Sequence, residues 1–196
     1  MFQVRIHGRG GQGAVTAAEL LSLAAFREGR HAQAFPSFGS ERTGAPVTAF
    51  CRTDDAPIRA HEPVTRPDAL VIQDATLLHQ VNVFEGLRPG GTVLINSPRR
   101  SEELGLASLT GTVPGAVVLT VPATAIAVRH VGRPVPSAVL LGGLAALTGC
   151  VRIGSLTAAI EERFPGALGA ANAAAAREAF ERVGAERKEP AGAEAD

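Results

Sequence analysis

The stretch Phe2-Gln-Val-Arg-Ile-His-Gly-Arg-Gly-Gly-Gln-Gly-Ala14 decides the fold of this 196-residue chain. Its first six residues alternate apolar and polar side chains, which is typical of a short β-strand. Three glycines then follow the spacing G-x-G-x-x-G, and residues 14–26 carry apolar side chains at helical intervals. Gly29 supplies a helix stop, and residues 31–35 form a second predicted strand that Pro36 closes. The N-terminal part therefore predicts a strand, a glycine loop, a helix and a second strand.

The rest of the chain predicts further strands and then a run of helices. The strands are expected over residues 47–52, 69–73, 92–96 and 116–121, and the helices over residues 122–131, 137–148, 155–164 and 168–183. Short apolar runs separated by helix-compatible stretches indicate an α/β fold. We expect a Rossmann-like, doubly wound, mostly parallel sheet with helices on both faces and a helical C-terminal part. The Gly142-Gly143 pair indicates close packing of its helix against a neighbour.

The composition sets bounds on domain organisation and partners. Hydrophobic residues make up 45% of the chain, enough to bury a core, and we expect a single domain over residues 1–185 followed by a disordered tail over 186–196. The 19 basic and 19 acidic side chains cancel, so the basic excess of a nucleic-acid binder is absent. No apolar run reaches the roughly 18 residues that span a bilayer, and we expect no charged-then-apolar leader, since the residues from Phe2 are strand-like. We therefore expect a cytoplasmic protein without nucleic-acid or membrane partners.

The chain also lacks the residue patterns of a metal or catalytic centre. Its two cysteines, Cys51 and Cys150, cannot supply the four thiolates of an all-cysteine iron–sulfur cluster or zinc site. The five histidines show no metal-ligand spacing, and no serine, cysteine or histidine arrangement resembles a nucleophilic triad. We therefore predict no catalytic residue and no metal ligand in this chain.

The glycine loop has three interpretations that the sequence leaves open. Free N–H groups at a helix start attract anions, and Arg9 would add a positive charge. The loop could instead contact a partner, or only let the first helix pack closely on the sheet. Dinucleotide binding is disfavoured because the second strand ends in Gln33-Ala-Phe-Pro36, without the acidic residue that binds a ribose. The candidate residues of this loop are Gly8, Arg9, Gly10, Gly11, Gln12, Gly13 and Thr16.

A second candidate loop runs from Phe35 to Pro46. It leaves the carboxyl end of the second strand beside the glycine loop, at the edge where open α/β sheets bind ligands. Two phenylalanines exposed together would form an unusual apolar patch, which favours a lid or an interface over a solvated loop. Its candidate residues are Phe35, Pro36, Phe38, Gly39, Glu41, Arg42 and Gly44. Asp74, at the end of a buried strand, is predicted either to contact a ligand or subunit or to cap the next turn through Thr76.

Three blocks at these loops carry a family resemblance. They are Gly8-Arg-Gly-Gly-Gln-Gly-Ala-Val-Thr-Ala-Ala-Glu-Leu-Leu21, Ala32-Gln-Ala-Phe-Pro-Ser-Phe-Gly-Ser-Glu-Arg-Thr-Gly-Ala-Pro-Val47 and Gln73-Asp-Ala-Thr76. Together they closely resemble the gamma subunit of pyruvate:ferredoxin oxidoreductase, a member of the 2-oxoacid:acceptor oxidoreductases. The resemblance is strong over residues 2–96 and looser to about residue 180.

The resemblance implies a subunit of an enzyme that decarboxylates a 2-oxoacid on thiamine diphosphate. Electrons would pass through [4Fe–4S] clusters to ferredoxin or flavodoxin, and the acyl group to coenzyme A. In the family, alpha and beta subunits hold thiamine diphosphate and Mg²⁺, and beta and delta segments hold the clusters. This chain would then carry no cofactor and be inactive alone. Pyruvate is the first expected substrate, followed by branched-chain 2-oxoacids and 2-oxoglutarate.

One hypothesis of our own and two alternatives accompany the resemblance. The hypothesis is that the loop from Gly8 to Gly13, with Arg9 and Arg42, contacts the phosphates of coenzyme A. The first alternative is a stand-alone NADP- or flavin-binding domain in which Arg42 meets a 2′-phosphate. The second is the beta subunit of an indolepyruvate oxidoreductase, a relative that shares the glycine block; the context of Phe35-Pro36 and Ala45-Pro46 favours the pyruvate-type gamma subunit.

Overall fold

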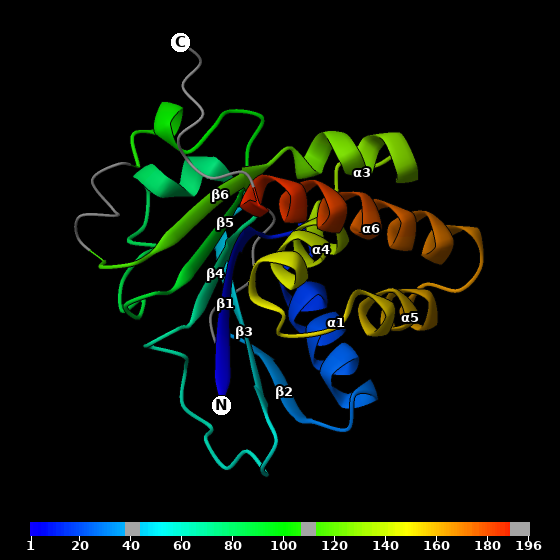
Figure 1. Cartoon of the computed structure of the whole chain (residues 1–196), viewed down its shortest axis with the longest axis horizontal. Coiled ribbons are helices and arrows are strands. Elements are labelled where there is room, and N and C mark those ends of the chain that lie inside the picture. The colour runs from blue at the N-terminus through cyan, green and yellow to red at the C-terminus, as the bar shows by residue number, and fades with distance from the viewer. Residues whose placement is uncertain (38–43, 107–112, 189–196) are drawn as a thin grey trace.

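The computed structural model describes residues 1–37, 44–106 and 113–188. Four predicted site residues, Phe38, Gly39, Glu41 and Arg42, lie outside the described residues. The chain has an α/β fold (Figure 1). Its described elements, in chain order, are β1 (Phe2–Arg9), α1 (Ala14–Arg27), β2 (His31–Pro36), β3 (Pro46–Asp54), β4 (Ala69–Ile72), η1 (Ala75–His79), β5 (Thr92–Asn96), η2 (Glu102–Leu104), β6 (Val117–Val121), α3 (Ala123–Val131), α4 (Ser137–Thr148), α5 (Ile153–Arg163) and α6 (Ala167–Lys188).

The six strands form one mixed sheet in the order β2-β3-β1-β4-β5-β6. Neighbours β1, β4, β5 and β6 run parallel, whereas β3 is antiparallel to both β1 and β2. The expected α/β fold with a mostly parallel sheet is confirmed. The sheet departs from a fully parallel one at β3, which lies between β1 and β2 and runs antiparallel to both. The connection over residues 37–45 is too short for a parallel crossover, which needs a dozen or more residues, so β2 and β3 form a hairpin.

Side chains of the strands alternate between two cores. Val4, Ile6 and Val71 face the larger core, which includes residues of the five described α-helices, while Leu70 and Ile72 face a smaller core on the opposite side. Figure 1 shows these helices gathered on one side of the sheet. We expected helices on both faces, but in the described residues the second face carries only loops and the short 3-10 helices η1 and η2.

Helix α4 lies at the centre of the larger core, between the sheet and α6. Ten of its twelve residues are buried, so it has no polar face. The expected close packing at its glycine pair is confirmed: a Cβ on Gly142 would overlap the backbone carbonyl of Ala176 in α6, and one on Gly143 would come within 2.8 Å of Leu94 Cδ2 in β5. The two glycines therefore let α4 approach α6 and the sheet at once.

The C-terminal helix is longer than expected. We predicted a helix over residues 168–183 and a disordered tail from residue 186, but α6 continues to Lys188. Its alanine-rich sequence favours helix, and the first proline beyond it is Pro190. Residues 189–196 lie outside the described residues. Within the described ranges, none of the helices combines the length and apolar character that a membrane crossing requires.

Candidate functional site

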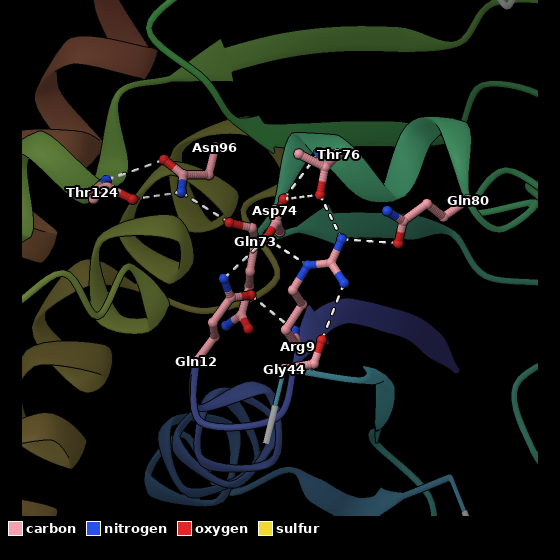
Figure 2. A network of polar contacts seen from close by, with 9 residues as sticks. All are labelled: Arg9, Gln12, Gly44, Gln73, Asp74, Thr76, Gln80, Asn96 and Thr124. Carbon is pink, nitrogen blue, oxygen red and sulfur yellow. Dashed lines mark hydrogen bonds and ion pairs between the residues drawn. The ribbon is translucent and has the colours of Figure 1, made fainter. Parts of the chain in front are cut away.

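The carboxyl ends of the parallel strands place the candidate site. From β1 the chain moves through α1 to β2 and β3 on one side, and then returns to β4 on the other side of β1. The edge between β1 and β4 is therefore the switch point of the sheet, where open α/β folds bind ligands. The polar residues at this edge come from the ends of β1 and β5, from the segments after β1 and β4, and from the start of α3 (Figure 2).

The glycine loop pairs with the start of β3. Gly11 and Gly13 have φ angles of +93° and +78°, which favour glycine, and Gly13 precedes the first turn of α1. Gly10 N–H donates to the carbonyl of Ala45 over 2.9 Å, and Gly44 N–H donates to the carbonyl of Gly10 over 3.1 Å. The two predicted loops therefore do meet at this edge, at Gly10 and Gly44.

Arg9 is tied to several segments at once. Its Nε donates to Asp74 Oδ2 over 2.9 Å, and its Nη1 donates to the carbonyl of Gly44 over 3.1 Å. Its Nη2 donates to Thr76 Oγ1 over 2.6 Å and to Gln80 Oε1 over 2.9 Å. Figure 2 shows the guanidinium at the centre of these contacts. The charge of Arg9 is thus paired with Asp74, and the side chain joins the end of β1 to η1 and to the residues just before β3.

Asp74 both caps η1 and receives the cation. Its Oδ1 accepts from Thr76 N over 2.9 Å and from Thr76 Oγ1 over 2.6 Å, which confirms the predicted cap. Its Oδ2 also accepts from Gln12 Nε2 over 3.2 Å. Burial alone would raise the pKa of Asp74, but the hydrogen bonds from Thr76, Arg9 and Gln12 outweigh it and hold the pKa below its ordinary value. The carboxylate stays ionised at neutral pH.

A second chain of hydrogen bonds, through Ser137 of α4 and Gln73, holds the glycine loop in place. Ser137 Oγ donates to the carbonyl of Gln12 over 2.8 Å and accepts from Gln73 Nε2 over 3.2 Å. We expected Ser137 to cap α4, but it is the first residue of that helix and its hydroxyl turns to the loop instead. Gln73 is buried against Gly8, where an added Cβ would overlap its Oε1. Gly8 is therefore needed for packing.

Asn96 joins the end of β5 to the start of α3. Its Nδ2 donates to the carbonyl of Gln73 over 2.9 Å and to Thr124 Oγ1 over 2.7 Å, and its Oδ1 accepts from Thr124 N over 3.1 Å. Figure 2 shows this bridge beside the Arg9 network. A free N–H at the start of α3 is therefore taken up within the protein.

A cavity of about 480 Å³ opens along this edge. Its lining comprises Gln12, Gln73, Asp74, Ala75, Thr76, Asn96, Pro98, Pro122, Thr124 and Ala125. Within the described part of the chain, this lining contains one acid and no cation, thiol or imidazole. The cavity can offer hydrogen bonds from amides and hydroxyls, but the described residues of its lining provide no positive charge of the kind that a phosphate prefers.

The remaining predicted residues lie in different surroundings. Phe35 and Pro36 belong to β2, and the Phe35 ring lies 5.1 Å from the Phe50 ring and beneath the Arg52 guanidinium. Phe35 is thus half-buried in the sheet, because strand alternation extends through it. Thr16 lies in the first turn of α1. The role proposed for both candidate loops in binding a ligand or partner stays a prediction.

Five polar residues of the site were not predicted from the sequence. They complete its hydrogen bonds, and none was a candidate: Gln73, Gln80, Asn96, Thr124 and Ser137. Asn96 ends a predicted strand, and its partner Thr124 follows the next one, so the rule that carboxyl ends of parallel strands meet could have identified both. Among the described residues, no group of three or more histidine, cysteine, aspartate or glutamate side chains could hold a metal ion.

The fold and the site define an α/β domain of the Rossmann type whose switch-point edge carries a polar hydrogen-bond network and lacks the acidic residue of a dinucleotide fingerprint. Residues 3–182 match the family model described as pyruvate ferredoxin/flavodoxin oxidoreductase. The chain therefore belongs to the pyruvate ferredoxin/flavodoxin oxidoreductase family.

Curated relatives match along nearly their whole length. The chain is 50% identical to the pyruvate/ketoisovalerate oxidoreductases common subunit gamma of Thermococcus kodakarensis, over 93% of this chain and 97% of the relative. It is 48% identical to pyruvate synthase subunit PorC of Methanothermobacter marburgensis, over 93% and 98%.

Solved structures share the fold. The pyruvate oxidoreductase subunit PORC of Thermotoga maritima is 36% identical, with a TM-score of 0.77 over 92% of this chain and 95% of that one. A 2-oxoglutarate:ferredoxin oxidoreductase of Magnetococcus marinus is 18% identical, with a TM-score of 0.73 over 94% of this chain and 31% of that one, and shows the fold alone. The same fold therefore also forms part of a longer chain.

Proposed function

We propose that this chain is the gamma subunit of an enzyme that oxidatively decarboxylates pyruvate or a related 2-oxoacid. Coenzyme A would accept the acyl group, and ferredoxin or flavodoxin would accept the electrons. The observation that carries the proposal is the match along nearly the whole chain to gamma and PorC subunits at about half identity. Full-length similarity at this level is far more specific than the glycine spacing by itself.

The cofactors are proposed to lie in partner subunits. Thiamine diphosphate and Mg²⁺ would be held by alpha and beta subunits, and the [4Fe–4S] clusters by beta and delta subunits. The donor set of this chain does not fit a cluster: Cys51 and Cys150 are both free and buried, and burial raises the pKa of each thiol, which disfavours the thiolate that iron requires. Two free buried thiols are also typical of a reducing compartment, which supports a cytoplasmic enzyme.

The role of this chain would then be architectural. The polar network around Arg9 and Asp74 fixes the edge of the sheet, and the described residues that line the cavity beside it include a single titratable side chain, Asp74. The alternative of an independent NADP or flavin domain is not favoured, because β2 ends in Phe35-Pro36 without an acidic residue and the described residues of the cavity lining carry no cation. The relatives named above also favour the pyruvate-type subunit over an indolepyruvate one.

Reconstitution tests the proposal directly. The chain is expressed alone and together with its alpha, beta and delta partners, and the reduction of a viologen dye is measured with pyruvate and coenzyme A. We expect no activity from the isolated chain, co-purification with thiamine- and cluster-bearing subunits, and loss of activity when this chain is omitted. Activity of the isolated chain, or an intact and active enzyme assembled without it, would overturn the proposal.

A further inference from the structure

The face of β1 opposite the α-helices buries a cation. Arg5 is only 8% exposed, and so is His7, although both alternate with the apolar residues Val4 and Ile6. Residues 63–65 and 82–85 come together over these side chains. Strand alternation alone would place Arg5 in solvent. Its burial therefore needs an explanation in its contacts.

Within the described ranges, the Arg5 guanidinium donates hydrogen bonds to neutral acceptors only. Its Nε donates to His7 Nε2 over 3.0 Å, and its Nη1 donates to the carbonyl of Val64 over 3.4 Å. Its Nη2 donates to the carbonyls of Val83 and Glu85 over 3.0 and 2.5 Å. A guanidinium has five N–H groups, so the second one on Nη1 has no acceptor among the described residues.

The charge of Arg5 is not paired within the described part of the chain. No carboxylate there lies within 4.0 Å of it. Burial lowers the pKa of Arg5, and the exposed Glu85 carboxylate opposes this from a greater distance. Arginine nevertheless keeps its proton in proteins, and a buried charge is unfavourable unless an opposite charge accompanies it. This contrasts with Arg9, which is paired with Asp74.

His7 adds a neutral partner. Because its Nε2 accepts from Arg5, its Nδ1 carries the hydrogen, and that atom lies 3.5 Å from Thr48 Oγ1. Burial and the Arg5 charge lower the pKa of His7 to about 4, so the ring is uncharged at neutral pH. The pair Arg5–His7 therefore carries a single positive charge.

A cavity of about 310 Å³ opens onto this pair. Thr48 and Asn82 supply polar groups to its wall, and Phe50 and Val64 supply apolar surface. This volume is at the lower end of ligand cavities, too small for a coenzyme. A single positive charge with the Glu85 carboxylate at the rim matches a monoanion better than a dianionic phosphate. The apolar wall suits a short carbon chain.

We propose that this cavity binds a small monocarboxylic acid, with Arg5 as the charged partner of its carboxylate. The site lies on β1 but on the opposite face from the α-helices, and it is separate from the cavity beside Asp74. The proposal does not depend on the function proposed above, because binding is measured on the full chain alone.

Paired ligands test the charge requirement. Propionate and its neutral isostere propionamide are titrated into the full chain, and the shifts of the His7 ring protons are followed by NMR. We expect propionate to shift these signals in a saturable way and propionamide and inorganic phosphate to leave them unchanged. Equal effects of propionate and propionamide, or tighter binding of phosphate, would contradict the proposal.

Two pairs of variants test the location. Asn82 is exposed, so Asn82→Asp should fold normally and weaken propionate binding at least tenfold, whereas Asn82→Ala should change it far less. Arg5→Met should abolish binding, and Arg52→Met is its matched control: Arg52 is also buried on this face, with Gln3 and Gln33 as partners, but does not line the cavity. Unchanged propionate affinity in Asn82→Asp would overturn the site even if Arg5→Met failed to fold.

Discussion

Arg9 and Asp74 lie at the ends of adjacent parallel strands and form an ion pair of 2.9 Å. Each side chain is about one-fifth exposed, so the pair is shielded more than a surface salt bridge. Gln12 and Thr76 also donate hydrogen bonds to the Asp74 carboxylate. The glycine loop and the segment after β4 are therefore held as one unit through Asp74.

This unit predicts strong coupling between the two residues. Arg9→Ala and Asp74→Asn should each lower the free energy of unfolding by about 1–3 kcal/mol, because each leaves a partly buried polar group without its charged partner. The double variant should lose clearly less than the sum of the two. Urea unfolding of the four proteins measures this. Additive losses would show that the pair is not a unit.

His7 predicts acid sensitivity with a defined sign. Its pKa is about 4 in the folded chain and near 6.5 when unfolded, so between these values the unfolded state binds more protons and stability falls as pH falls. The full loss is about 3 kcal/mol at 1.36 kcal/mol per unit. His7→Gln, whose amide oxygen can still accept from Arg5, should remove this dependence. Denaturant unfolding from pH 7 to pH 4 tests this; parallel curves for both proteins would refute it.

Two glycines in the packed helices predict opposite outcomes. Gly142→Ala should destabilise the chain by about 1–3 kcal/mol, because the new methyl group overlaps the Ala176 carbonyl. Gly184→Ala in α6 meets no atom within 4 Å and should stabilise by roughly 0.4–1 kcal/mol through reduced freedom of the unfolded chain. Thermal unfolding compares the two. A destabilised Gly184→Ala would show that the second site is constrained in another way.

The coenzyme A hypothesis gives a kinetic prediction for the assembled enzyme. Because Arg9 is already paired with Asp74, we expect Arg42→Ala to raise the Michaelis constant for coenzyme A more than Arg9→Ala does. The Michaelis constant for pyruvate serves as the internal control and should not change. An unchanged constant for coenzyme A in both variants would reject the hypothesis that this edge contacts its phosphates.

The elements of the fold follow from local patterns, but one strand position does not. Alternation in β1 and short apolar runs at β4 and β5 identified strands because each pattern depends on neighbouring residues. The position of β3 between β1 and β2 depends on pairing partners far along the chain. Only the short connection between the two strands, over residues 37–45, favours a hairpin. Five-residue η1 is too short to show a helical period.

The candidate site was predicted in part for the same reason. Parallel-strand geometry predicted that the loop from Phe35 to Pro46 lies beside the glycine loop, and the described end of that loop does meet it, at Gly10 and Gly44. The pairing of Arg9 with Asp74 could not be predicted, because both residues also suited a role in binding a ligand. The buried charge of Arg5 was missed because alternation assigns polar residues to solvent, and only the tertiary structure shows what covers them.

Helix α4 has a consequence for the making of this protein. Its sides are buried by the sheet and by α6, which follows α4 in the chain and therefore leaves a ribosome after it. A nascent chain that ends before Ala167 would present the leucines of α4 to water. Such a chain is prone to aggregation until α6 emerges. Premature termination anywhere ahead of α6 would therefore yield an insoluble fragment instead of a shorter working domain.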